Sequence, residues 1–239
     1  MADGNVLLEA KDGVATVTLN RPAVFNALNQ EMAEALVRAI EACGEDGNTR
    51  AVILTGAGRG FCAGGDMKAA WAHIQAGGDP GHFFRDLTVP LHRVISDLRL
   101  MEKPVIAAIE SARFKQAYTS IGLVPDGGWT AIVPQIIGPA KAAELLLLDP
   151  LLDAQQALAM GLVHEVVSDD QLAEHVQAVA SGLAQGRASA FGAAKALLNA
   201  ALFPHLEVQL ERERQRIIAQ GGTAAFRERL GAFIDKHKS

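Results

Sequence analysis

Two different spacings of hydrophobic residues mark the first part of the chain. Short β-type runs at Val6–Glu9 and Val14–Leu19 flank Lys11-Asp12-Gly13, a combination typical of a β-hairpin. Beyond Asn20-Arg21-Pro22 the apolar residues return every three to four positions, and this predicts a helix over Asn29–Ala42 with Asn29 as its N-cap. The residues that share the apolar face of this helix are Met32, Leu36 and Ile40.

The continuous apolar run Ala51–Thr55 predicts a buried strand, and a glycine-rich turn follows it at once. The turn ends at Asp66, a suitable N-cap for a predicted helix over Met67–Gln75. A strand, a glycine-rich turn and a helix N-terminus can together hold negative charge with main-chain N–H groups. The turn matches neither the phosphate-loop nor the dinucleotide-binding pattern, so taken alone it favours a connecting role.

The remaining pattern predicts an α/β layer fold whose last third is helical. A second glycine-rich turn, Gly122–Gly128, carries one carboxylate, Asp126. The charged stretch at Glu211–Arg216 suggests a packing appendage or an oligomer contact. Helices are expected over His82–Met101, Trp129–Ile136, Ala140–Leu147, Asp153–Met160, Asp170–Ala184, Ala188–Leu202, Glu207–Ala219 and from beyond Gly222 to about Lys236, and strands over Val105–Ile109 and Leu162–Val167.

Composition narrows the class of protein. The 239 residues are 49% hydrophobic and 21% charged, which is typical of a globular chain with a sizeable core. A net charge of −5, without a basic aromatic cluster, argues against a nucleic-acid partner. The apolar runs are too short to cross a membrane, and no signal peptide is visible. Two cysteines and seven scattered histidines give no disulfide framework and no metal site, so we expect a cytoplasmic protein.

Several segments then coincide, in order, with one family pattern. They are Asn20-Arg21-Pro22 with Asn26-Ala27-Leu28, Ala51–Lys68, Lys103–Ala107, Gly122–Gly128 and Ala157–Val163. Together they resemble the enoyl-CoA hydratase/isomerase (crotonase) superfamily over nearly the whole chain. The resemblance implies an α/β spiral of ββα units over residues 1–185 and a helical trimerisation region over 186–239. It also implies acyl-CoA substrates, a homotrimer or a dimer of trimers, and no separate cofactor, because coenzyme A belongs to the substrate.

The resemblance also implies site residues. In this family two backbone N–H groups stabilise the thioester enolate, and by position the Gly65 N–H is the first donor. A side chain at Gly65 would block the approach of the thioester. Lys236 lies where the family often places a basic residue near the CoA phosphates, although a solvated lysine is an equal explanation. The implied contacts to coenzyme A and the acyl group are Val24, Phe25, Asn26, Ala27, Ala63, Asp66, Met67 and Tyr118.

One part of the family pattern is missing. After the strand that corresponds to Val105–Ile109, the family has a loop, a helix and a strand that carry the second N–H donor and one hydratase glutamate. Here Ile109 is followed at once by Glu110, so about 20 residues are absent. Either the deletion is real or a mobile segment is missing from the sequence, and the mobility of the family around the pocket favours the second. Glu110 is therefore not assigned a catalytic role.

The position of the second hydratase glutamate is occupied by Tyr118, which cannot act as a carboxylate base. Isomerase branches place an acid in the second glycine-rich turn, here Asp126, where an apolar setting favours proton transfer between carbons. The alternative is that Asp126 caps the helix that begins near Trp129. We therefore predict an enoyl-CoA isomerase, with hydration as the nearest alternative. A non-catalytic acyl-CoA binder would follow from a real deletion, and nucleotide binding is a weak fourth possibility.

Overall fold

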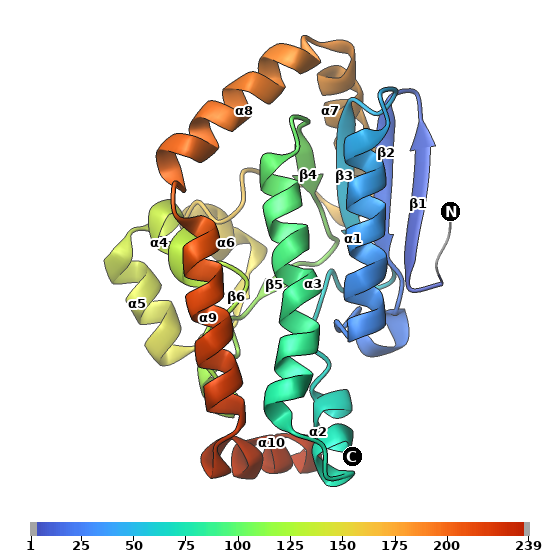
Figure 1. Ribbon diagram of the computed structural model, residues 1–239. Coiled ribbons are helices and arrows are strands. Elements are labelled where there is room, and N and C mark those ends of the chain that lie inside the picture. The colour runs from blue at the N-terminus through green and yellow to red at the C-terminus, as the bar shows by residue number, and fades with distance from the viewer. Residues whose placement is uncertain (1–3, 237–239) are drawn as a thin grey trace. The chain divides into compact units, whose positions relative to one another are not determined.

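The computed structural model describes residues 4–236 (Figure 1). These residues form two compact units, each assembled from segments that are distant in the sequence. The first unit takes in residues 4–64, 93–112 and 166–204, and the second takes in 65–92, 113–165 and 205–236. The division of the chain at residue 185 stays a prediction.

A four-stranded sheet with the order β1-β2-β3-β4 forms the centre of the first unit. The predicted hairpin is confirmed: β1 (Val6–Lys11) and β2 (Val14–Leu19) pair antiparallel with Val6 opposite Leu19. Asp12 and Gly13 form its two-residue turn, and both have positive φ, as a turn that follows the strand twist requires. β3 (Ala51–Gly56) pairs parallel with β2 and with β4 (Val105–Ala107).

Helices pack on this sheet because its central strand is apolar on both faces. Ala51 to Leu54 are all buried, as expected for a parallel strand that is covered on both sides. One face of β3 packs against Val176, Ala180 and Ala184 of α7 (Asp169–Gln185). α1 (Gln30–Glu45) contacts β1 and β2, and its predicted face of Met32, Leu36 and Ile40 is buried. The other elements of this unit are η1 (Pro22–Val24), α8 (Ala188–Leu202) and the C-terminal part of α3 (Pro80–Leu100).

The second unit is mainly helical. Its short strands β5 (Arg113–Phe114) and β6 (Leu152–Asp153) pair with each other. Its core joins Phe84 of α3 to Phe226 of α10, whose rings meet edge to face with centroids 5.5 Å apart. Its other elements are α2 (Met67–Gln75), most of α3, η2 (Thr119–Ile121), α4 (Trp129–Ile137), α5 (Pro139–Leu148), α6 (Ala154–Ala159), α9 (Leu206–Gly221) and α10 (Ala224–Lys236).

One predicted strand is wrong. Residues 162–167 form turns and irregular backbone, because Gly161 has a φ of +77° and the Leu162 N–H donates to the Ala157 carbonyl, 2.9 Å away, at the end of α6. The apolar run alone could not separate a strand from a partly buried turn. Within residues 4–236, no helix has the length and apolar character needed to span a bilayer.

Candidate active site

Asp126 lies in the turn that leads into α4. Gly127 and Gly128 follow it with φ values of +71° and +80°, a conformation in which a side chain is strained. Asp126 is 4% exposed, and its Oδ1 lies 2.8 Å from Nε2 of His92 on α3. A carboxylate and an imidazole in contact, both shielded from water, form a pair that can hold and move a proton.

The structure excludes one of the two roles considered for Asp126, that of helix cap. α4 begins at Trp129, its N-cap is Gly128, and no side chain of the cap residue closes the first turn. The carboxylate of Glu213 on α9 fills this place instead, accepting from the Gly128 N–H at 2.7 Å and from the Thr130 N–H at 2.9 Å. The side chain of Asp126 is therefore not the helix cap, and it faces His92.

His92 is the residue that the sequence analysis missed. Its side chain is 12% exposed and comes from α3, 34 positions before Asp126. Its position in the sequence shows neither a paired histidine nor a motif, so no local signal distinguished it from the other histidines. Only the packing of α3 against the Asp126 turn reveals the pair.

Tyr118, predicted as a pocket residue, lies next to the same turn. Its hydroxyl donates to the main-chain carbonyl of Asp126 at 3.4 Å, and its ring packs against the core of the second unit. The structure thus brings Asp126, His92 and Tyr118 together. The tyrosine hydroxyl thus binds the backbone of the turn.

Gly65 lies in the same unit and packs against α3. A Cβ added there would meet the Met67 side chain at 3.0 Å and the Leu87 side chain at 3.1 Å, so a side chain fits only if these neighbours move by a few tenths of an ångström. Within residues 4–236 the Gly65 N–H has no hydrogen-bond acceptor. Leu87 precedes His92 by five residues, about 7.5 Å along the axis at 1.5 Å per residue. Gly65, next to Leu87, and Asp126, next to His92, therefore lie against one short stretch of α3.

Asp66, Met67 and Lys236 have separate positions in the second unit. The Asp66 side chain accepts from the Ala69 N–H at 3.0 Å, which confirms the predicted N-cap of α2. Met67 is the first residue of that helix and borders the position of a Gly65 side chain. Lys236 is the exposed last residue of α10.

The other predicted contacts belong to the first unit. Asn26 is fully buried with a φ of +55°, and its amide donates to the carbonyls of Ala57 and Gly60 at 3.0 and 2.6 Å. Its Oδ1 accepts from the Arg21 N–H, so this side chain ties the loop to the glycine-rich turn. In the same loop Val24 is half-buried, Phe25 is 54% exposed and Ala27 is buried. The Ala63 N–H donates to the Phe25 carbonyl at 3.0 Å.

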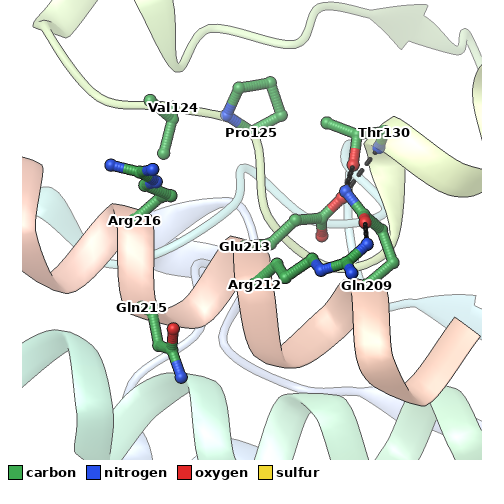
Figure 2. A pocket seen from close by; sticks show the side chains of 8 residues that line it. All are labelled: Val124, Pro125, Thr130, Gln209, Arg212, Glu213, Gln215 and Arg216. Carbon is green, nitrogen blue, oxygen red and sulfur yellow. Dashed lines mark hydrogen bonds between the residues drawn. The ribbon is translucent and has the colours of Figure 1, made fainter.

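A cavity of about 430 Å³ adjoins the Asp126 turn (Figure 2). One wall is the loop at Val124 and Pro125, and the other is α9. The side chains of α9 that line it are Gln209, Arg212, Glu213, Gln215 and Arg216, and Thr130 of α4 completes it. The cavity is thus apolar at the loop and polar along the helix, with two guanidinium groups on the helix side.

The junction at Ile109 and Glu110 closes as a tight turn. Glu110 and Ser111 form the turn, and the Ser111 N–H and hydroxyl both donate to Asp169, the N–H at 2.8 Å. The Ala108 N–H donates to the Leu54 carbonyl at 3.1 Å, so the sheet is paired up to this point. The 239-residue chain has no further residues here, and the expected mobile segment with its second N–H donor is absent from it.

Two family models, both described as enoyl-CoA hydratase/isomerase, match residues 14–112 and 105–239. The chain is 34% identical to a 1,2-epoxyphenylacetyl-CoA isomerase from Escherichia coli, covering 97% of this chain and 95% of the relative. It is 35% identical to a probable enoyl-CoA hydratase from Rhodobacter capsulatus, covering 99% and 97%. A crystal structure of an enoyl-CoA hydratase from Mycobacterium avium subsp. paratuberculosis superposes with a TM-score of 0.86 at 28% identity, over 97% of this chain and 96% of the other.

The same comparisons bear on the junction. The alignment with the Escherichia coli relative runs over 256 positions but takes in 97% of 239 residues, about 232, so about 24 positions have no counterpart in this chain. The two family models overlap over residues 105–112, a stretch that contains Ile109 and Glu110. The first finding agrees with an internal segment that the relative has and this chain lacks.

Proposed function

Because the chain belongs to the enoyl-CoA hydratase/isomerase family, we propose that it moves the double bond of an enoyl-CoA thioester through an enolate. In this proposal the Gly65 N–H stabilises the thioester oxygen, and Asp126 carries the proton between the α and γ carbons. Asp126 takes the α proton, negative charge develops on the thioester oxygen, and Asp126 returns the proton to the γ carbon. The double bond thereby shifts with no change in composition.

The observation that carries the proposal is the hydrogen bond between Asp126 and His92. A carboxylate that only capped a helix would accept from main-chain N–H groups, whereas Asp126 is buried and meets an ionisable side chain at 2.8 Å. His92 orients the Asp126 carboxylate and can stabilise it while the proton is on the substrate. The Gly65 N–H, which has no acceptor among residues 4–236, supplies a donor for charge that develops only during the reaction.

Hydration of an enoyl-CoA is the second candidate, because one relative is named as a probable enoyl-CoA hydratase. Water addition by paired carboxylates is less well supported here, since Tyr118 stands at the position of one of them. The nearest buried carboxylate, Glu213, is occupied by three donors from Gly128 and Thr130. A binding protein without turnover is the third candidate, because the second N–H donor is missing with the segment after Ile109.

The test uses Asp126→Asn, which keeps the shape of the side chain and removes the base. Turnover of 3-enoyl-CoA substrates should fall by about 10²–10⁴, while the dissociation constant for the thioester stays within about twofold. Full turnover of the variant on every enoyl-CoA that the parent accepts would show that Asp126 is not the proton carrier. Water addition to crotonyl-CoA by the parent would favour hydration, and thioester binding without turnover would favour the third candidate.

A further inference from the structure

Glu213 is a buried acidic residue for which neither the family comparison nor the proposed chemistry supplies a role. It is 4% exposed and lies on the face of α9 that also buries Leu210 and Ile217. Burial raises the pKa of its carboxyl group, with its hydrogen-bond donors acting in the opposite direction. A carboxylate in such a place is tolerated only when its oxygens are fully bonded.

Three donors satisfy the carboxylate, and all come from the start of α4. Oε2 accepts from the Gly128 N–H at 2.7 Å. Oε1 accepts from both the N–H and the hydroxyl of Thr130 (Figure 2). Gln209, one turn before Glu213 on α9, donates to the Thr130 hydroxyl oxygen at 2.9 Å. That donation leaves the hydroxyl hydrogen directed at Glu213.

Glu213 thus replaces the N-cap that α4 lacks. The first N–H groups of a helix need acceptors, and the positive end of its dipole favours an anion. Gly128 has no side chain that could accept a hydrogen bond or carry a charge. Its φ of +80° makes any side chain at this position strained. The acceptor therefore comes from a residue 85 positions away in the sequence.

We infer that Glu213 is the positioning residue for Asp126, holding the Asp126-Gly127-Gly128 turn so that the carboxylate of Asp126 meets His92. This inference rests on the proposed function, because it assigns Glu213 a part in the same proton transfer. The connection is short: Gly128 is two residues beyond Asp126, and the Trp129 N–H donates to the Asp126 carbonyl at 3.4 Å. Gly127 and Gly128 both have positive φ and carry no side chain that could hold the turn.

Glu213→Gln tests the inference. The amide keeps the size of the side chain, but its NH₂ group cannot accept a hydrogen bond. One of the two main-chain N–H groups, of Gly128 or of Thr130, therefore loses its acceptor. We expect kcat to fall about tenfold or more, since small misplacements of a reacting group cost that much, and KM to stay within about twofold. Glu228→Gln, an exposed change on α10, is the control and should leave both constants unchanged.

A second readout separates positioning from general loss of structure. The Nε2 resonance of His92, followed by ¹⁵N NMR, reports its hydrogen bond to Asp126 without any substrate. It should shift in Glu213→Gln and stay unchanged in Glu228→Gln. Thr130→Val removes a single donor to Glu213 and should produce the same effects on a smaller scale. It tests the positioning role if Glu213→Gln does not fold.

Asp126→Asn is measured in parallel, so that the two proposals fail differently. Loss of turnover in Asp126→Asn together with parental kcat and an unshifted His92 resonance in Glu213→Gln and Thr130→Val would overturn the role of Glu213 alone. Full turnover in Asp126→Asn would overturn the proposed function and the role of Glu213 with it. A lower kcat, a constant KM and a shifted His92 resonance in Glu213→Gln would support the inference.

Discussion

Replacing Lys195 by methionine is expected to lower the free energy of unfolding by about 2–4 kcal/mol. Lys195 lies on α8, and its Nζ donates to three carbonyls at and beyond the C-terminus of α3: Leu98 at 2.6 Å, Met101 at 2.9 Å and Lys103 at 3.0 Å. Asn199, one turn later on α8, donates to the Arg99 carbonyl at 2.5 Å. The last carbonyls of a helix have no donors within the helix, and here the side chains of α8 donate to them.

The magnitude follows from what the substitution leaves behind. A buried carbonyl without a partner costs about 1–3 kcal/mol, and three such losses do not add in full, because water reaches part of this half-buried region. Methionine keeps most of the apolar stem and therefore most of the packing. Gly192, on the same face of α8, also holds the helices close, since a Cβ there would lie 2.4 Å from the Glu102 carbonyl oxygen.

Equilibrium unfolding in urea measures the effect, with Lys141→Met as the control. The Lys141 side chain is 42% exposed and pairs with Glu144 across one turn of α5, an arrangement worth about 0–1 kcal/mol. Equal losses in the two variants would refute the capping role of Lys195.

The pH dependence of the free energy of unfolding gives a second test of the role of Lys195. Burial lowers the pKa of Lys195 to about 8, whereas an unfolded lysine ionises near ~10.4. Between these values the unfolded chain binds more protons than the native protein, so native stability rises with pH in this window. The difference between the parent and Lys195→Met should therefore grow from pH 8 to about 10.4. A shrinking difference would mean that the three carbonyls stabilise the cation more than burial penalises it.

Two further predictions concern the candidate site. In Gly65→Ala the new Cβ would lie 3.0 Å from Met67 Cε and 3.1 Å from Leu87 Cδ2, so these side chains or the turn must shift by a few tenths of an ångström, and kcat should fall about tenfold in steady-state assays. Gly182→Ala, where a Cβ meets no atom within 4 Å, should keep the parental kcat. Electrospray mass spectrometry should give 25.2 kDa for the intact protein. A mass greater by about 2 kDa, the weight of a loop, a helix and a strand of average length, would mean that the protein carries a segment at the Ile109–Glu110 junction.

The sequence predicted those elements whose ends carry local signals. α2 has the predicted bounds because Asp66 caps its start and Gly77-Gly78 follow its end. α8 also has its predicted bounds. β5 and β6 were missed because two residues each are too few to show a period, and their pairing joins residues 38 and 40 positions apart. The apolar run at 162–167 was misassigned for the opposite reason: it has strand composition but forms no ladder.

The candidate site was predictable only in part. Asp126 and Gly65 followed from the family pattern, and the structure gives both a geometry that suits their predicted roles: a buried carboxylate on His92, and a main-chain N–H that has no acceptor within residues 4–236. His92 and Glu213 did not follow from it. Each contacts the Asp126 turn from a different helix, and the contacts span 34 and 85 positions. Such contacts leave no trace in a single sequence, because the partner side chains are common residue types on amphipathic helices.

The two roles considered for Asp126, helix cap and proton carrier, show why contacts between residues far apart in the sequence matter. From the sequence, an aspartate before Gly-Gly and a helix is a good N-cap, and nothing local argues against that role. A helix start needs an acceptor, so Asp126 can turn away from α4 only if another group takes its place. Glu213 is that group, and it costs the protein a buried carboxylate whose raised pKa reflects its desolvation. The burial of Glu213 at the start of α4 therefore leaves the Asp126 carboxylate in contact with His92 instead of with the first N–H groups of the helix.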